Sequence, residues 1–414
     1  MTAGTSITRA HGWISRSCSE PCCCSSPSRP IPTRRPVTSG PEPGEMTRRV
    51  NRCDRPPDPS SNRCPITTET QTGTRPITTS PPRIVCVGSN LESRVVLEGL
   101  IATGAQVVGL VTLPDGSSAV SDHVDLHPLC ERHGIETIDT TDINSGPTIA
   151  AIERLKPDYL YTLGWSQLFG DELLSVPVRY VVGSHPSPLP EGRGRAPVPW
   201  TILQGCDRSA VTLFRMDIGV DSGPILCQKW FSVPPSGYAS DIYEMVAENL
   251  RDAFCELHEA QRSGTVVPER VQPSEGSSYR ARRTSADGHI DFRQSAETIE
   301  RLVRAVSHPY PGAYSYYGGT KVVFWRASLQ ETPNHVGTPG QILLSKDGRL
   351  LVQAGDRPLW LFDAMVESGP ECETLFRVGH KFGYAVEDEL HRLQNELSRL
   401  QMEWDTWRQA REAA

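Results

Sequence analysis

A histidine and two aspartates stand in the two stretches of this chain that are best suited to acid–base chemistry. His185 lies in a loop, 183–197, that contains four Pro and three Gly residues. Pro fixes φ and Gly permits positive φ, so this loop is expected to be stiff and specifically shaped. Asp217 and Asp221 lie in a second loop, which follows the apolar run 211–214. An imidazole titrates near neutrality and a neighbouring carboxylate can orient it, which suits the pair to general acid–base catalysis.

Each of these residues also has a purely structural interpretation. A histidine in a loop often serves stability or is simply solvated. Asp217 can form a turn, because Asp side chains bond their own backbone in loops. Residue types alone therefore leave both interpretations open.

Short apolar runs alternate with helix-like stretches before these loops, which predicts a doubly wound, mostly parallel α/β sheet. In such sheets ligands bind beyond the carboxyl ends of the strands, where both loops are expected. Gly88-Ser89-Asn90 does not form a G-x-G-x-x-G fingerprint and no Walker A pattern is present, so a nucleotide cofactor is not indicated. The predicted strands are 84–88, 107–111, 135–138, 158–163, 180–182 and 211–214.

The remaining chain divides by composition. Residues 1–82 are rich in Pro, Ser, Thr and Arg, which predicts disorder; an Arg/Ser-rich transit peptide and a translation start at Met46 are alternatives. An amphipathic helix from Ser240 closes the first domain, and short strands suggest a small β-barrel-like, OB-like second domain. The predicted parts are a disordered segment (1–82), an α/β domain (83–262), a linker (263–280), the second domain (281–368) and a helical tail (369–414).

The tail carries apolar residues at alternating steps of three and four. This seam can form a homo-oligomer or dock on the body of the same chain. Its members are Leu390, Leu393, Leu397, Leu400, Trp404 and Trp407.

Charge and cysteine content narrow the class of protein. The net charge is −7, but residues 1–82 carry eleven Arg, no Lys and six acidic residues, which leaves −12 for residues 83–414. An acidic body is a poor general surface for nucleic acid. Twelve scattered cysteines indicate reduced thiols, and no His lies at ligand spacing from Cys22–Cys24, so no metal is predicted. No apolar run is long enough for a membrane helix, and a cytoplasmic location is expected.

Two motif blocks resemble the folate-dependent formyltransferase family, which includes methionyl-tRNA, glycinamide ribonucleotide and amino-sugar formyltransferases. The first is His185-Pro-Ser-Pro-Leu-Pro-x-x-Arg-Gly-x-Ala-Pro, followed by Val-Thr-Leu-x-x-Met-Asp-x-Gly-x-Asp221-x-Gly. The second block, Arg282-Arg283-Thr-x-x-Asp-Gly-x-Ile-Asp-Phe and later Leu302-Val-Arg-Ala-x-x-His-Pro-Tyr-Pro-Gly-Ala, resembles the domain that follows the catalytic domain in the tRNA and UDP-4-amino-4-deoxy-L-arabinose enzymes. The resemblance covers about residues 83–368.

The resemblance implies that a primary amine attacks the formyl carbon of 10-formyltetrahydrofolate and forms a tetrahedral intermediate. His185 would relay a proton or stabilise the oxyanion, and Asp221 would keep the imidazole charged or oriented. Two loops, 163–168 and 215–221, would hold the pterin, and Trp165 would either pack on the folate ring or fill the core. The implied donor-binding residues are Leu163, Gly164, Trp165, Gln167, Leu168, Arg215, Met216, Asp217 and Gly219.

One position departs from the family pattern. The family has Asn two residues before the catalytic His, whereas this chain has Gly183. Ser184 is expected to point away, because alternate strand residues face opposite sides. Gln167 or Ser166 is a hypothetical replacement donor.

The sequence favours a small amine as acceptor, most of all that of a nucleotide-linked amino sugar; a hydroxylated amino acid amine is left open. The stretch 113–125, where tRNA enzymes carry a basic insertion, has no Lys or Arg. Gly194-Arg195-Ala196-Pro197 also resembles the sugar enzymes more than Gly-Ala-Ala-Pro of the tRNA enzymes. Methionyl-tRNA as acceptor is the alternative within the family. A weakly or non-catalytic folate-binding protein and a formate-releasing hydrolase are alternatives of other classes.

Overall fold

The computed structural model describes residues 80–114, 123–366, 376–383 and 386–412. The predicted disorder of residues 1–82 therefore falls almost wholly outside the described residues.

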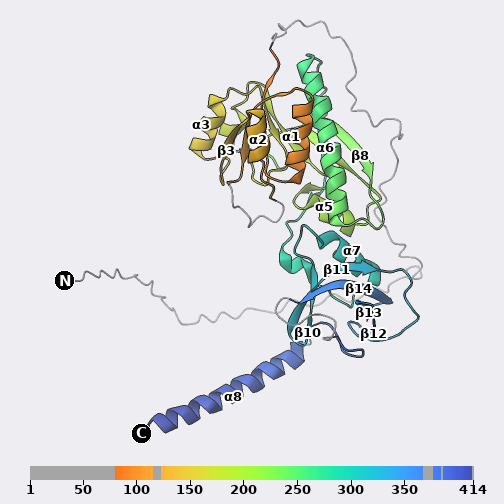
Figure 1. Ribbon diagram of the computed structural model, residues 1–414. Coiled ribbons are helices and arrows are strands. Elements are labelled where there is room, and N and C mark those ends of the chain that lie inside the picture. Colours follow the sequence, from red (N-terminus) through yellow and green to blue (C-terminus); the bar gives the residue numbers. More distant parts are fainter. Residues whose placement is uncertain (1–79, 115–122, 367–375, 384–385, 413–414) are drawn as a thin grey trace, which may run out of the picture. The chain divides into compact units, whose positions relative to one another are not determined.

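The first domain, which carries the labels α1, α2 and α6 in Figure 1, is built on one sheet. This sheet has seven strands in the order β3-β2-β1-β4-β5-β7-β8. β1 to β5 run parallel, whereas β7 is antiparallel to both β5 and β8. The predicted doubly wound, mostly parallel sheet is confirmed. The strands are β1 (Arg83–Val87), β2 (Gln106–Thr112), β3 (Glu136–Asp139), β4 (Tyr159–Thr162), β5 (Tyr180–His185), β7 (Arg208–Arg215) and β8 (Ile225–Ser232).

Helices cover both faces of this sheet. Ile84 and Cys86 of β1 pack among residues of α1, α2 and α6, while Val85 and Val87 pack among residues of α3 and α4. Alternate residues of a strand point to opposite faces, so a β1 buried on both sides needs its continuous apolar run. The helices are α1 (Leu91–Ala102), α2 (His127–His133), α3 (Gly146–Arg154), α4 (Asp171–Leu174), α5 (Pro197–Leu203) and α6 (Ala239–Arg262).

The second domain is built on a five-stranded antiparallel sheet in the order β10-β11-β14-β13-β12. The amphipathic helix α7 (Ala296–Val306) precedes it and buries Ile299 and Val303 completely or nearly so. The sequence predicted a small β domain here, and the antiparallel sheet confirms it. Its other elements are η2 (Ser285–Gly288), β10 (Ala313–Tyr317), β11 (Thr320–Ser328), β12 (Ile342–Lys346), β13 (Arg349–Gln353) and β14 (Pro358–Val366).

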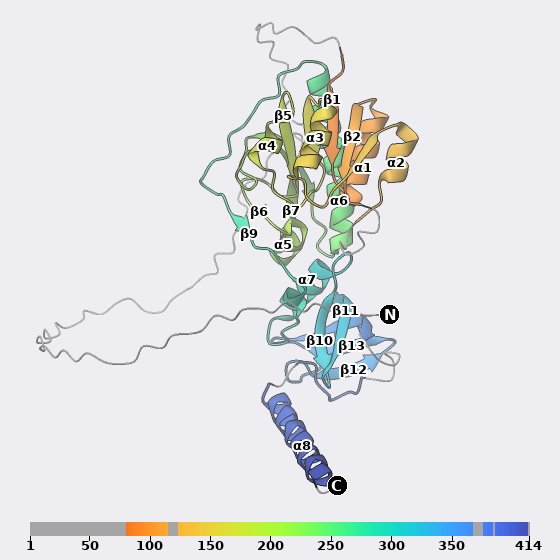
Figure 2. The ribbon, with the colours of Figure 1, turned by 90° about the vertical axis from the view of Figure 1, so that its left-hand side faces the viewer.

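The predicted linker does more than join the domains. Its last residues form β9 (Tyr279–Arg280), which pairs in parallel with β6 (Arg193–Gly194). Figure 2 shows the two strands next to each other. The Arg193 amide also donates to the carbonyl of Ser278 at 2.9 Å, and the Arg195 amide donates to that of Arg280 at 3.1 Å. The segment 272–280 therefore holds the loop that follows His185.

The predicted tail helix is present as α8 (Val386–Glu412). Within the described part of the chain, no helix combines the length and apolar character that a membrane span requires.

Candidate active site

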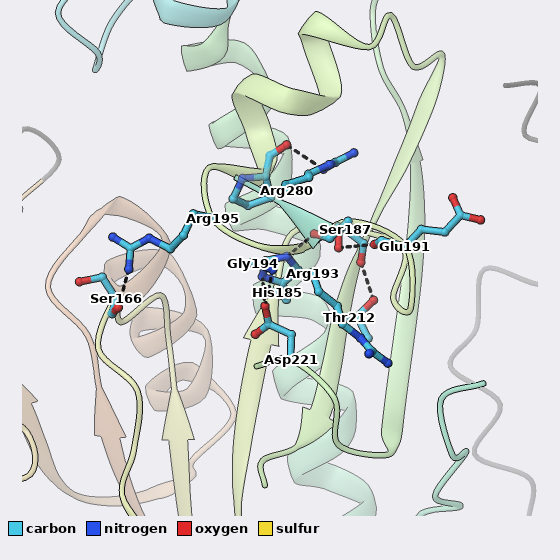
Figure 3. Close-up of polar contacts among 12 residues, drawn as sticks. Ser166, His185, Ser187, Glu191, Arg193, Gly194, Arg195, Thr212, Asp221 and Arg280 are labelled. Atoms are coloured by element: carbon cyan, nitrogen blue, oxygen red, sulfur yellow. Dashed lines mark hydrogen bonds and ion pairs between the residues drawn. The ribbon is translucent and has the colours of Figure 1, made fainter. Parts of the chain in front are cut away.

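His185 is the last residue of β5 and is only 6 % exposed. Its Nε2 lies 2.9 Å from the carbonyl oxygen of Gly192, and its Nδ1 lies 3.6 Å from Oδ2 of Asp221. A carbonyl can only accept, so Nε2 carries the hydrogen in this contact. Figure 3 shows Asp221 directed toward His185 and Gly194. The sequence placed these two side chains together, and the geometry does the same.

Asp221 reaches His185 by an unexpected route. β7 is antiparallel to β5, so its end at Arg215 lies beside Val182, three residues or about 10 Å short of His185. The loop after β7 must therefore return along β5. Asp221 adopts φ 50°, a left-handed conformation that few residues other than Gly adopt, and its Oδ2 accepts a 2.8 Å bond from the amide of Gly194. This bond joins the loop after β5 to the loop after β7 directly.

Asp217 has the turn-forming role that its residue type allows. Its Oδ1 accepts from the amide of Gly219 at 3.0 Å and from the hydroxyl of Ser222 at 2.8 Å. These bonds close the loop on itself and help to fix the residues before Asp221.

The position of the family Asn is filled by other side chains. A Cβ added to Gly183 would lie 2.6 Å from Cζ of Phe214 and 2.8 Å from Cγ of Met216. Ser184 turns to the opposite face, as predicted, where its hydroxyl donates to the carbonyl of Thr162 at 2.8 Å. The aromatic ring and the thioether thus occupy the space into which an amide at residue 183 would project.

The proposed replacement donor, Gln167, is bonded elsewhere. Its Oε1 accepts from the amide of Ile143 at 2.9 Å and its Nε2 donates to the carbonyl of Thr141 at 2.7 Å. Both ends of the amide therefore hold the main chain of 141–143, which argues against the replacement hypothesis. The carbonyl of Ser166 accepts a 2.8 Å bond from Nη1 of the exposed Arg195.

The loop after β4 contains the first group of predicted donor-binding residues. Leu163 is buried, Gly164 has φ 91°, and Leu168 is 63 % exposed. Trp165 packs at the edge of the core cluster around Val85, yet its Nε1 is a buried donor without a partner among the described residues.

The loop after β7 contains the second group. Arg215 is exposed and its Nη1 lies 3.3 Å from Oε1 of Glu269. Met216 is half-buried, and its amide donates to the carbonyl of Val181 at 2.9 Å, which fixes the loop against β5. The two loops therefore start from β4 and β7, the strands on either side of β5.

Family models match both domains. The model described as formyl transferase matches residues 87–257, and the model described as formyl transferase, C-terminal domain, matches residues 282–374. The chain belongs to the formyltransferase family. The predicted membership and the order of the two motif blocks are thereby confirmed.

Several individual proteins are similar to this formyltransferase. A methionyl-tRNA formyltransferase from Caldanaerobacter subterraneus is 28 % identical over 291 residues, covering 69 % of this chain and 92 % of that protein. A solved structure of HypX from Aquifex aeolicus with tetrahydrofolic acid has TM-score 0.51 at 21 % identity, covering 70 % of this chain and 45 % of that chain. An N-formyltransferase from Helicobacter canadensis with folinic acid and dTDP-3-aminofucose has TM-score 0.52 at 16 % identity, covering 69 % of this chain and all of that chain. This chain thus spans a little under half of HypX, and the structural similarities establish the fold.

The residues around the site fit the formyl donor of this family, 10-formyltetrahydrofolate. The buried Nε1 of Trp165 is a free hydrogen-bond donor among the described residues, in one of the two loops implied to hold the pterin. A buried donor without a partner is costly, and a polar ring such as a pterin would satisfy it.

Sequence patterns missed part of this formyltransferase site. Arg193 is 8 % exposed and Gln272 is 8 % exposed, and the guanidinium donates to Oε1 of Gln272 from Nε at 3.1 Å and from Nη2 at 2.7 Å. Nη1 of Arg193 also donates to the hydroxyl of Tyr279 at 3.1 Å. Gln272 and Tyr279 lie in the segment that composition marks as a linker, and no local pattern distinguishes them there.

Proposed function

We propose that this protein transfers the formyl group of 10-formyltetrahydrofolate to the primary amine of a nucleotide-linked amino sugar. The observation that carries the proposal is the contact of His185 with Asp221, 3.6 Å apart at the carboxyl end of β5, in a fold similar to that of solved formyltransferases. The Asp221 carboxylate is held in place by the amide of Gly194, which donates to its Oδ2.

The chain's residues supply acid–base chemistry for this transfer. The amine nitrogen bonds to the formyl carbon, the bond from that carbon to the folate nitrogen breaks, and the proton that the amine loses ends on that folate nitrogen. With Nε2 bonded to the Gly192 carbonyl, the His185 ring takes or holds the mobile proton at Nδ1, on the side of Asp221. The Asp221 carboxylate orients the ring, and a ring that holds this proton can also stabilise negative charge on the formyl oxygen.

Charge around the site supports a small anionic acceptor. Arg195 is exposed, three residues after the Gly192 carbonyl that contacts His185, and its guanidinium extends toward Ser166. An exposed guanidinium at this place suits a diphosphate. The stretch 113–125 contains no Lys or Arg, although its residues 115–122 lie outside the described structure, and residues 83–414 carry −12. Both features disfavour a large polyanion.

Methionyl-tRNA is the second candidate acceptor. The similarity to the Caldanaerobacter subterraneus enzyme spans 92 % of that protein and therefore includes both domains. The two-domain organisation is compatible with methionyl-tRNA as acceptor. The choice between methionyl-tRNA and an amino sugar nucleotide therefore rests on the charge around the site.

A panel of acceptors tests the proposal. Formylation of UDP- and dTDP-amino sugars and of charged initiator tRNA would be followed with 10-formyltetrahydrofolate as donor. We expect turnover with an amino sugar nucleotide, and His185→Ala and Asp221→Asn should each lower kcat by about a hundredfold to ten-thousandfold. His289→Ala, an exposed histidine of the second domain, is the control and should leave kcat unchanged. Activity on tRNA alone would overturn the acceptor, and donor binding without turnover on any acceptor would overturn the enzymatic proposal.

A further inference from the structure

The seam of α8 is open to solvent. Leu and Trp side chains that alternate at steps of three and four residues all remain about half exposed along this helix. Burying such side chains stabilises a protein, so six of them on one stripe favour a covering partner. The exposed fractions are 55 % for Leu390, 49 % for Leu393, 56 % for Leu397, 49 % for Leu400, 59 % for Trp404 and 50 % for Trp407.

Steps of three and four give the 3.5-residue period of a left-handed coiled coil. We propose that the α8 helix of a second copy of this chain covers the seam, and that the two helices run parallel as a coiled-coil dimer. Leu390, Leu397 and Trp404 then occupy the a positions, while Leu393, Leu400 and Trp407 occupy the d positions.

Charges beside the seam select the parallel direction. In this register Glu396 and Glu403 are at g, while Gln394, Gln401 and Arg408 are at e. A parallel dimer places each g residue near the e residue five positions later on the other helix, which pairs Glu396 with Gln401 and Glu403 with Arg408. An antiparallel dimer places g residues beside g residues, so glutamates would face one another. The parallel arrangement contains an attractive pair and avoids that repulsion.

Off-seam residues already have charge partners within their own helix. Arg399, at a c position, pairs with Glu396 at 2.6 Å, and Arg408 pairs with Asp405 at 3.2 Å. Such pairs support an exposed helix but cover none of its apolar side chains. The apolar stripe therefore remains the surface that a second helix would bury.

Two exposed apolar residues of α8, one on the seam and one off it, allow a matched test. Leu400→Glu places a charge on the seam, whereas Met402→Glu places one at the f position, where the side chain is 66 % exposed. Sedimentation of the full chain over a wide concentration range should give a dimer for the wild type and for Met402→Glu, and a monomer for Leu400→Glu. Circular dichroism checks that each variant keeps its helical content. A monomeric wild type, or equal behaviour of the two variants, would overturn the proposal.

Charge exchange then tests the direction. Glu403→Arg and Arg408→Glu should each raise the dissociation constant of the dimer by up to about tenfold, because each creates like-charge pairs across the seam. The double variant restores opposite charges across the seam only in a parallel dimer, where it should raise the constant by less than the two single changes together. Additive losses in the double variant would exclude the parallel arrangement.

A second inference comes from the buried carboxamide of Gln272. Its Nε2 donates to the carbonyl oxygens of Asp221 at 2.9 Å and Gly223 at 2.7 Å, while its Oε1 accepts both bonds from Arg193. All four hydrogen-bonding sites of the amide are therefore used. The Nε2 end of the amide holds the loop of Asp221, and the Oε1 end holds Arg193. The next residue, Gly194, donates its amide hydrogen to Asp221.

We infer that Gln272 is a positioning residue, which holds Asp221 in its left-handed conformation and directs its carboxylate to His185. This inference rests on the proposed function of Asp221. A left-handed Asp is less stable than an extended one unless its surroundings fix it, and the two carbonyl bonds from Gln272 provide that restraint.

Gln272→Met tests this role, because Met has a similar volume and makes none of the four bonds. We expect kcat to fall at least tenfold, with little change in the KM of the donor and with an altered pH profile of kcat. The control is Gln261→Met, which removes a half-buried amide that bonds Tyr161 and Tyr180 away from the site. It should affect stability and leave the pH profile unchanged.

A double-mutant cycle separates the two ideas. If Gln272 acts through Asp221, adding Gln272→Met to Asp221→Asn should lower kcat no further. A further drop equal to that in the wild type would overturn the positioning role. An Asp221→Asn variant with normal kcat would instead contradict the proposed function itself.

Discussion

A single methyl group at Gly183 tests how tightly the segments around His185 and Asp221 are packed. The added Cβ would lie 2.6 Å from Cζ of Phe214 and 2.8 Å from Cγ of Met216. Carbon atoms in favourable contact are about 3.5 Å apart, so the ring would have to retreat by ~0.9 Å. Phe214 is 3 % exposed and packs against Leu189 and Ile225, which leaves it little room.

The expected cost follows from this crowding. Overpacking a core by one or a few carbons costs about 1–3 kcal/mol. Met216 is half-buried and can move, whereas the Phe214 ring cannot, so we expect Gly183→Ala to lower the free energy of unfolding by about 2 kcal/mol. Gly183→Asn restores the amide that is usual in the family, yet it should lower both stability and kcat. The new side chain would displace Phe214 and Met216, from which the chain continues into the loop that carries Asp221.

Urea unfolding measures the first effect. Gly146→Ala is the matched control, because a Cβ added to Gly146 would meet no atom within 4 Å. Gly146 is the first residue of α3, a position that tolerates Ala. The control should change the free energy of unfolding by no more than about 0.5 kcal/mol or raise it slightly. The double variant Gly183→Ala/Phe214→Leu should lose less stability than the sum of the two single changes, because the shorter side chain makes room. If Gly183→Ala is as stable as Gly146→Ala, the packing described here is incorrect.

Three further predictions concern the first domain. His258 is 1 % exposed, and burial lowers its pKa below 6.5, so the unfolded chain binds a proton that the folded protein does not. The free energy of unfolding should therefore fall as the pH drops below about 6.5. Urea unfolding at a series of pH values should show a shallower fall for His258→Leu. Asn90 accepts from the amide of Ser93 at 3.0 Å and caps α1, so Asn90→Ala should cost about 1 kcal/mol of unfolding free energy whereas Asn90→Asp keeps most of it. Burial raises the pKa of the Cys130 thiol to about 11 and raises the pKa of the Cys86 thiol further. When the native protein is alkylated at mildly alkaline pH, peptide mapping should find both thiols unmodified. Rapid labelling of either thiol would contradict their burial.

The sequence by itself determined the family and the fold class. Apolar runs and helical periodicity are local properties, which is why β1 and the start of α6 could be placed within one residue of their bounds. The motifs around His185 and Asp221 identified the two loops, because stiff Pro- and Gly-rich segments carry their shape in their own residues. The fold of both domains and the contact between the two side chains agree with that interpretation.

Tertiary structure decided how the loops meet. No periodicity shows that β7 runs antiparallel to β5, and that direction obliges Asp221 to reach back to His185. Gln272 bonds Asp221 from 51 residues away, and its surroundings in the sequence are those of a plain linker. Sequence patterns report which residues neighbour one another along a strand or helix, whereas the partners of a buried amide or of an added Cβ depend on which distant segments the fold brings together.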